Sequence, residues 1–358
     1  MGASFHRLTV LIGLVFFAGA CADDANDDAG AGGAMALGGV QGGGGQAMGG
    51  VAGEMGGMDA AGGAMSGGIQ AGPPIEPGFT ADARTEAHPD RTFDLYVPSA
   101  PPTAAVVFLH GGKGTKEGQA EKLGLSPFSA DVIDDLGVAW VLPKGEDGLG
   151  VSTWNNRVMD SGADDVAYLT ALSTWIRARL GVQRVLLAGH SNGGMMAHRM
   201  WCEAEAAFDR YLSVAGPPSV DYAVEGGVFA CMGTRPYWSI VGNADKVLGT
   251  TGNLMAPTWE IALGANQADA FVNRTVINSI FAHHDLRAIP GCGAEDGGSL
   301  EDSEQKTMWS ACDDTFRLWL VKEPDPSRRG RLLGNHPVDA LEADGGFAVA
   351  ELVAEWSR

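Results

Sequence analysis

The stretch 185-VLLAGHSNGGMMAHRM-200 decides the fold of this chain. Its apolar start predicts a strand, and its end predicts a helix. Between them, Gly189 and Gly193 flank Ser191 in a G-x-S-x-G pattern. After a strand and before a helix, this pattern indicates a sharp elbow that strains the serine backbone and exposes its hydroxyl. The flanking residues must be small, because strand and helix approach each other closely there. We predict a nucleophilic serine; the alternative is a glycine-rich turn with an idle one.

The segments around this elbow alternate between strand and helix patterns. Continuous apolar runs over 104–109 and 137–143 are typical of strands buried on both faces. Residues 164–181 carry an apolar stripe at helical spacing, and Asp164 and Asp165 suit the positive end of that helix. The alternation predicts an α/β domain over 78–358, with a mainly parallel sheet covered by helices on both faces. Further strands are predicted at 91–98, 184–188, 237–242 and 315–321, and a closing helix at 346–356.

A nucleophile elbow also needs two N–H groups that hold the oxyanion of a tetrahedral intermediate. The amide of Asn192 follows the serine at a helix N-terminus, where the helix dipole favours negative charge. The strand 104–109 runs into His110-Gly111-Gly112, whose glycines let backbone amides approach a substrate oxygen. We expect the Gly112 N–H to be the second donor, with the Lys113 N–H as the alternative.

The remaining groups of such a site are an acid and a base, in the chain order Ser, Asp, His. Asp245 ends the segment 242-GNAD-245, just past a predicted strand. His336 lies in 333-LGNHP-337, in a loop before the closing helix. We therefore predict that Asp245 orients the imidazole of His336, which acts as the base for Ser191.

Other histidines are alternatives for the base. The segment 283-HHD-285 is helix-like and follows no clear strand, which favours a surface or capping role. His110 and His190 flank the site, and we interpret them as structural or pocket-lining residues. His198 falls on the helix after the elbow, where a side chain is packed or exposed.

These motifs give the chain a resemblance to the secreted polyhydroxybutyrate depolymerase and feruloyl esterase group of α/β-hydrolases. The resemblance implies an α/β-hydrolase fold, a catalytic triad of Ser191, Asp245 and His336, and ester hydrolysis. It covers roughly 90–358 and is carried by LHGG (109–112), DDVAYL (164–169), GHSNGGMMAHRMWC (189–202), VAG (214–216), GNAD (242–245), GC (291–292) and WSAC (309–312).

The chain departs from this group at two positions that border the substrate. Relatives often carry tryptophan and proline after the catalytic histidine, where this chain has 335-NHPVDAL-341. They also often carry a cysteine or another side chain at the position of Gly112. Ester hydrolysis is therefore expected, but the polymer specificity of the relatives is not. A peptidase or acyltransferase on the same scaffold and a non-catalytic surface binding protein are the alternatives.

Four of the five cysteines lie in the predicted domain, which suits two disulfides in an oxidising compartment. Metal binding is the alternative, but no C-x-x-C pair or histidine cluster has zinc spacing. The resemblance implies the pairs Cys202–Cys231 and Cys292–Cys312, each contributing on the order of 3 kcal/mol. We expect no metal and no organic cofactor.

The net charge of the chain is −20, and no basic stripe is visible, which argues against nucleic acid as a partner. We expect a monomer whose partner is a small-molecule or polymeric ester. Membrane contact is expected only through a lipid anchor.

The N-terminal segment carries export signals. A basic start precedes the apolar run 8-LTVLIGLVFFAGA-20, which is typical of a secretory signal peptide over 1–20. The junction 18-AGAC-21 resembles a bacterial lipoprotein box, in which Cys21 becomes the lipidated first residue of the mature chain. Ordinary signal cleavage is the alternative.

Residues 21–77 are dominated by glycine, and no lysine or arginine occurs between Ala22 and Arg84. No apolar face there can offset the entropy of ordering, so we predict a flexible tether. Ala22 after the cysteine resembles an outer-membrane sorting signal. We expect an exported protein, lipid-anchored to the bacterial envelope at the outer membrane, or otherwise secreted.

Overall fold

The computed structural model describes residues 75–148, 151–157, 161–216, 234–245, 247, 299–312, 315–323, 334 and 336–357. The predicted signal peptide, the lipidation site Cys21 and residues 22–74 of the tether lie outside these ranges. The same holds for Cys231, Cys292 and the segment 283–285. Predictions on those residues remain predictions.

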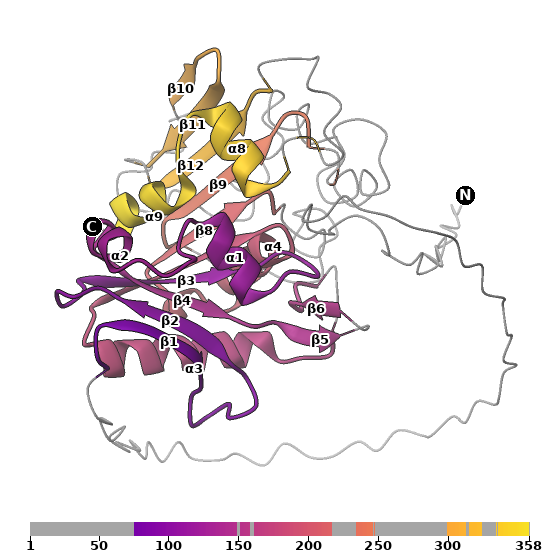
Figure 1. The fold of residues 1–358 in the computed structure, drawn as a ribbon. Helices are drawn as coiled ribbons and strands as arrows, with labels where there is room; N and C mark the ends of the chain where they lie inside the picture. Colours follow the sequence, from indigo (N-terminus) through magenta and orange to yellow (C-terminus); the bar gives the residue numbers. More distant parts are fainter. Residues whose placement is uncertain are drawn as a thin grey trace, which may run out of the picture. The chain divides into compact units, whose positions relative to one another are not determined.

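A ten-stranded sheet forms the centre of the described part of the chain (Figure 1). A separate two-stranded sheet pairs β5 (Glu146–Gly148) with β6 (Val151–Thr153). The strands of the large sheet, in spatial order, are β1 (Gly78–Ala83), β2 (Phe93–Val97), β4 (Ala139–Pro143), β3 (Ala104–Leu109), β7 (Arg184–His190), β8 (Arg210–Val214), β9 (Tyr237–Gly242), β12 (Phe316–Val321), β11 (Lys306–Ala311) and β10 (Ser299–Asp302).

The strands from β4 to β12 in this order run parallel to one another, and β2 runs antiparallel beside β4. The chain forms β3 before β4 but places β3 nearer the centre, and it then adds β7, β8, β9 and β12 outward on that side. This is the strand arrangement of an α/β-hydrolase fold. The predicted fold class is confirmed.

Helices cover both faces of the sheet, as predicted. One apolar core joins the sheet to α3 (Asp165–Leu180) and α4 (Asn192–Glu203). The core on the opposite face joins it to the other α-helices of the described residues, which are α1 (Lys116–Lys122), α2 (Ala130–Leu136), α8 (Val338–Gly345) and α9 (Val349–Ser357). A short 3-10 helix, η1 (Glu205–Ala207), follows α4.

Two aromatic stacks show how strand alternation builds the two cores. Neighbouring side chains on a strand point to opposite faces of the sheet. Tyr237 of β9 stacks on Trp201 of α4 with ring centroids 4.5 Å apart. The next residue, Trp238, stacks on Trp356 of α9 at 4.2 Å on the other face. One strand therefore anchors a helix on each side.

The structure differs from the sequence prediction at the C-terminus. The closing helix predicted at 346–356 is present as α9, but the sequence pattern did not predict α8, which precedes it and ends where Gly346 adopts a left-handed conformation, φ 64°. Gly346 therefore terminates a helix instead of starting one. His336 consequently precedes α8, which is not the last helix. Elements that the sequence pattern did not predict also include β1, β8, β10, β11, α1 and α2.

Cys202 and Cys312 each take part in a disulfide bond. Their predicted partners lie outside the described residues, so the pairing remains a prediction. None of the helices in the described part of the chain combines the length and the apolar character of a membrane span.

Candidate active site

Ser191 sits at a strained turn between β7 and α4. Its φ is 52° and its ψ is −118°, a backbone conformation that residues other than glycine rarely adopt. Such a residue costs on the order of 1–3 kcal/mol and persists only when its surroundings hold it. Its N–H donates to the Val214 carbonyl of β8 at 2.8 Å, which ties the turn to the neighbouring strand. The strand–turn–helix context predicted from the sequence is present.

The two flanking glycines are required by close backbone contact. A Cβ on Gly189 would clash with the carbonyl of Gly193, and a Cβ on Gly193 would lie 2.5 Å from the carbonyl oxygen of Leu109. Helix α4 therefore begins directly against β7 and the end of β3. The physical reason given for small residues at these positions holds in the structure.

Ser191, His336 and Asp245 form one hydrogen-bonded chain, although they are far apart in the sequence. The Nε2 of His336 lies 2.9 Å from Ser191 Oγ, and its Nδ1 lies 2.8 Å from Asp245 Oδ2. Asp245 Oδ1 accepts the N–H of Val247 at 2.8 Å, which fixes the rotation of the carboxylate. All three side chains are buried, and Asp245 follows the C-terminal end of β9. The imidazole is therefore placed to exchange a proton with the serine hydroxyl while a carboxylate orients it.

The other histidines of the described residues do not contact Ser191 through a hydrogen bond. His198 is buried on α4, where its ring lies 5.7 Å from those of Trp201 and Tyr237. Its Nε2 also lies 3.8 Å from Cys202 Sγ, so the contacts of His198 lie within this core and not at the serine. The alternative pair in 283–285 lies outside the described residues.

The loop after β3 lies against the elbow, as an oxyanion hole requires. A Cβ on Gly111 would lie 3.4 Å from Ser191 Cβ, and one on Gly112 would lie 3.6 Å from Asn192 Cβ. Lys113, the alternative donor, gives its N–H to the Ser152 carbonyl at 2.8 Å. That contact leaves Gly112 as the better candidate of the two. Asn192 is the first residue of α4, at the positive end of the helix.

Trp154 fixes the residue that follows the serine. Its N–H donates to Asn192 Oδ1 at 2.7 Å, and its carbonyl accepts from Asn192 Nδ2 at 3.2 Å. Asn156 Nδ2 also donates to the Asn192 carbonyl at 3.3 Å. Sequence reasoning did not identify these residues, because the segment after β6 has no local motif that links it to the elbow.

His110 fixes the oxyanion loop from the other side. Its Nε2 accepts the N–H of Gly145 at 2.9 Å, so Nδ1 carries the proton and donates to the Gly111 carbonyl at 2.7 Å. Burial lowers the pKa of His110 to about 4, so the ring is neutral at ordinary pH. Trp154 Nε1 donates to the His110 carbonyl at 3.1 Å. His110 thus has the structural role that the sequence suggested.

The likenesses of this chain to known proteins are distant. No protein-family model matches the chain, and no curated protein does. Among solved structures, an acetyl xylan esterase from Aspergillus awamori is 15% identical, with a TM-score of 0.45, and the match covers 72% of this chain and 95% of that one. A thermostable esterase is 12% identical, with a TM-score of 0.46, over 78% of this chain and 63% of that one. A Bacillus cereus carboxylesterase is 15% identical, with a TM-score of 0.35, over 55% and 83% of the two chains. These likenesses are too distant to carry an argument about activity.

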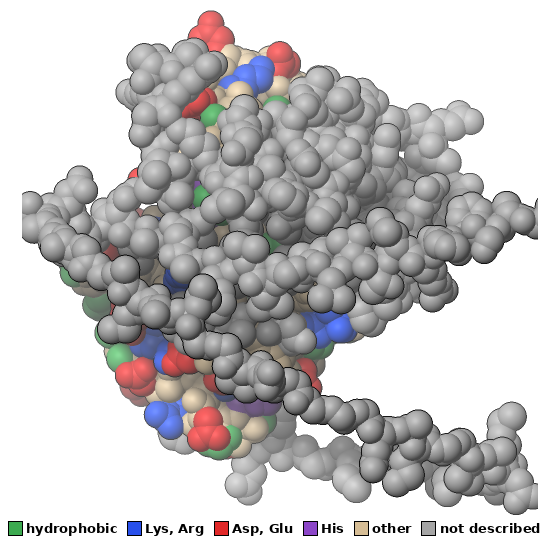
Figure 2. Space-filling model, turned by 90° about the vertical axis from the view of Figure 1, so that its right-hand side faces the viewer, with side chains coloured by type: hydrophobic (Ala, Val, Ile, Leu, Met, Phe, Trp, Pro, Cys, Tyr) green, Lys and Arg blue, Asp and Glu red, His purple; other side chains and the backbone are tan. Residues whose placement is uncertain are grey.

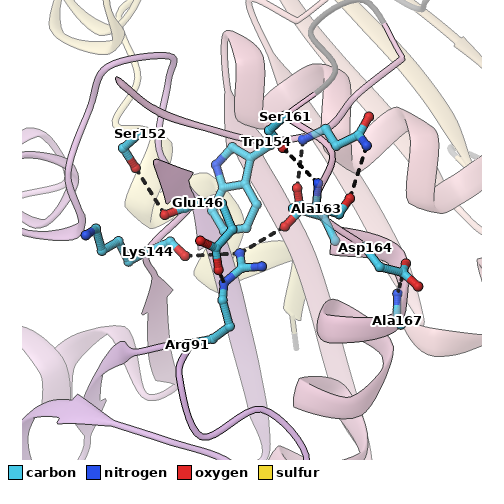
Figure 3. Close-up of polar contacts among 12 residues, drawn as sticks. Arg91, Lys144, Glu146, Ser152, Trp154, Ser161, Ala163, Asp164 and Ala167 are labelled. Atoms are coloured by element: carbon cyan, nitrogen blue, oxygen red, sulfur yellow. Dashed lines mark hydrogen bonds and ion pairs between the residues drawn. The ribbon is translucent and has the colours of Figure 1, made fainter. Parts of the chain in front are cut away.

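A second cluster, around the buried Arg91, lies beside Trp154 (Figure 3). Arg91 Nη2 donates to Asp165 Oδ1 at 2.9 Å, and Arg91 Nε lies 3.0 Å from Glu146 Oε1. The other oxygen of Asp165 accepts the N–H of Asn155 at 2.7 Å. The ion pair therefore holds the backbone next to Trp154, which in turn holds Asn192.

The charged surface in view is mixed in sign. Acidic and basic side chains are interspersed over the described residues visible in Figure 2, with no basic stripe among them. Within the described ranges, no three His, Cys, Asp or Glu side chains gather as metal ligands. The groups that the structure brings together at Ser191 suit nucleophilic catalysis by a serine.

Proposed function

We propose that the protein is an extracytoplasmic serine hydrolase of carboxylic esters. One observation carries this proposal: the hydrogen-bonded chain from Ser191 through His336 to Asp245. The strained backbone of Ser191 supports it, because strain of this kind persists where a site requires a particular side-chain direction. An idle serine would gain nothing from that conformation.

The proposed reaction has two displacement steps. His336 Nε2 takes the proton of Ser191 as the serine oxygen attacks the ester carbonyl, and Asp245 stabilises the imidazolium. The N–H groups of Asn192 and Gly112 hold the oxyanion, each contributing about 3 kcal/mol to the transition state. Collapse of the intermediate releases the alcohol, which takes the proton from His336. Water, deprotonated by the same imidazole, then attacks the acyl-serine. The bond between the acyl carbon and Ser191 Oγ breaks, the acid is released, and His336 returns the proton to Ser191 Oγ.

The substrate class is proposed as carboxylic esters without a polymer preference. The sequence resemblance to polyhydroxybutyrate depolymerases and feruloyl esterases supports ester chemistry. The departures at Gly112 and after His336 lie beside the proposed oxyanion and base, where the relatives' acyl and alcohol groups would lie. We therefore do not extend the proposal to a particular polymer.

The decisive experiment compares esters with peptides. Purified protein would be assayed on short p-nitrophenyl acyl esters and on peptide p-nitroanilides, in parallel with Ser191→Ala. We expect ester hydrolysis by the wild type and none above background by the variant. A fluorophosphonate should modify Ser191 once per chain. Cleavage of the anilides but not of the esters would identify a peptidase. Absence of both activities would identify a non-catalytic binding protein.

Anchoring is a separate part of the proposal and rests on the sequence of residues 1–77. We expect Cys21→Ser to leave ester hydrolysis unchanged and to release the protein from the membrane fraction or block its processing. A tether of about 55 residues has a root-mean-square span of about 40 Å, enough to hold the domain clear of a bilayer. If the wild-type protein is soluble and its mature N-terminus is unmodified, the lipid anchor is contradicted and ordinary secretion is the better interpretation.

A further inference from the structure

His190 is a buried histidine at the end of β7, next to the serine, to which the proposed reaction assigns no role. Its side chain is 6% exposed and reaches across to the segment that carries the proposed base. Its Nε2 lies 2.9 Å from the backbone carbonyl oxygen of His336. The two imidazole rings lie 5.0 Å apart, at 50° to each other.

The direction of this hydrogen bond follows from its partner. A carbonyl oxygen only accepts, so Nε2 of His190 carries the proton and donates it. Burial lowers the pKa of His190 well below its ordinary value, and the nearby His336 lowers it further. The ring therefore stays neutral and offers one N–H in a fixed direction. On its other side, a Cβ on Gly111 would lie 3.2 Å from Nδ1, so the ring is held between the oxyanion loop and the base.

The hydrogen bond from His190 restrains the backbone of His336, which the hydrogen bonds of the His336 imidazole do not. The bonds of His336 to Ser191 and Asp245 fix the two ring nitrogens, but the backbone on which the ring turns needs its own restraint. The carbonyl of His336 is one bond from its Cα, so a donor there fixes the pivot of the side chain. Since His190 directly precedes Ser191 in the chain, the same hydrogen bond fixes the position of the His336 backbone relative to Ser191.

We infer that His190 is a positioning residue, which holds the backbone of His336 so that its Nε2 stays within hydrogen-bond reach of Ser191. The inference rests on the proposed ester hydrolysis for its kinetic consequence. A displacement of about 1 Å in a reacting group can cost about 100-fold in rate. Loss of the donor should therefore lower kcat and leave ester binding intact.

The test uses two substitutions at this one position. His190→Leu removes the donor, whereas the side-chain amide of His190→Gln can place an N–H near the position of Nε2. We expect His190→Leu to lower kcat about 10- to 100-fold with KM changed less than about threefold. His190→Gln should recover most of the rate. Equal losses in both variants, or a wild-type kcat in His190→Leu, would overturn the inference.

A matched control separates positioning from packing. His198→Leu replaces another fully buried histidine, on α4, that packs against aromatic rings. It should alter the melting temperature but keep kcat. If His190→Leu does not fold, His190→Asn takes its place, because its shorter amide cannot reach the His336 carbonyl. Wild-type kcat in the asparagine variant would also count against the inference.

A spectroscopic readout keeps this inference distinct from the proposed function. The proton that His336 Nδ1 shares with Asp245 should give a downfield NMR signal in the wild type. We expect the signal to broaden or shift in His190→Leu and to return in His190→Gln, whether or not an ester is hydrolysed. A signal unchanged in His190→Leu would overturn the positioning role. Absence of wild-type ester hydrolysis would instead remove the proposed function.

Discussion

Two aspartates of this protein are equally buried but have different partners. Asp245 and Asp165 are both fully buried. Asp245 lies 2.8 Å from His336, and Asp165 lies 2.9 Å from Arg91. His336 then contacts the strained Ser191, whereas the guanidinium of Arg91 stacks over Tyr168, 4.1 Å from its ring centroid, and faces Glu146.

The difference separates a site that can react from one that supports it. Arginine keeps its charge at every ordinary pH, so the Arg91 cluster has no proton to transfer. An imidazole can both accept and donate a proton, and that of His336 faces a hydroxyl group. A hollow of about 470 Å³ is lined by Arg91, Glu146 and Asp164, among others, and Ser191 is not part of its wall. Burial, charge and a hollow therefore do not distinguish the candidate active site from the Arg91 cluster, whereas an imidazole beside a strained serine does.

The largest expected effect comes from removing the nucleophile. Ser191→Ala should lower kcat by about 10⁶-fold, since members of such a triad act as a unit. The matched control is Ser173→Ala on α3, a buried serine whose hydroxyl donates to the Ala207 carbonyl and has no part in the chain from Ser191 to Asp245. Ester kinetics on both variants measure the effect. A rate of a tenth of the wild-type value in Ser191→Ala would show that Ser191 is not the nucleophile.

The next effect concerns the supporting cluster and should appear in stability. Arg91→Met leaves Asp165 as an uncompensated buried charge and should lower the free energy of unfolding by about 3–5 kcal/mol. Replacing both residues, as Arg91→Met with Asp165→Leu, should restore part of that loss. Urea unfolding measures both variants.

The control for this prediction is a more exposed ion pair. Arg177 and Asp209 lie 2.7 Å apart, with side chains 31% and 26% exposed. Exposed pairs contribute at most about 1 kcal/mol, so Arg177→Met should cost much less than Arg91→Met. Equal losses would show that burial of the Arg91 cluster is not what makes it important.

An intermediate effect should appear on acidification. The pKa of His110 in the folded state is about 4, because the ring is buried, whereas an unfolded histidine takes up its proton below about pH 6.5. Between these values the unfolded state binds more protons, so stability is greatest above about pH 6.5 and falls as the pH drops toward 4. The slope for one such group is about 1.4 kcal/mol per pH unit.

Unfolding by urea at pH 7.5, 6.0 and 5.0 measures this slope. His190 adds to it in the same direction, because its pKa is also lowered by burial. We expect His110→Gln to have a shallower slope than the wild type between pH 6.5 and 5. An identical slope would mean that His110 is protonated in the folded state at those pH values.

The smallest effect separates two neighbouring aspartates. Asp164 is the N-cap of α3 and accepts the N–H of Ala167 at 3.0 Å at the surface, whereas Asp165 is buried against Arg91. Asp164→Ala should cost about 1 kcal/mol, and Asp164→Ser should keep most of that contribution. Asp165→Ala should cost about 3–5 kcal/mol, because it removes the buried partner of Arg91 and leaves only the more exposed Glu146 as a carboxylate beside it. Similar losses of unfolding free energy in the two alanine variants would contradict the different roles assigned to Asp164 and Asp165.

The sequence by itself determined the elements whose signals are local. The elbow is visible because strand, glycine, serine and helix follow one another within a dozen residues. Asp245 was identified because it directly follows a predicted strand, and His336 because it lies in the loop before the closing helix and completes the chain order Ser, Asp, His. The α/β class followed from alternating apolar runs. In each case, neighbouring residues impose the backbone geometry, so the pattern and the structure agree.

Only the tertiary structure decided which distant groups hold these elements in place. The Trp154–Asn192 clamp, the Arg91–Asp165 pair and the His190–His336 contact join residues 38, 74 and 146 positions apart. A hydrogen bond requires its two atoms to lie about 3 Å apart, and folding sets that distance through the whole sheet and its helices. No local pattern of residues records it. The proposed reacting groups were therefore predictable from the sequence, and the groups that position them were not.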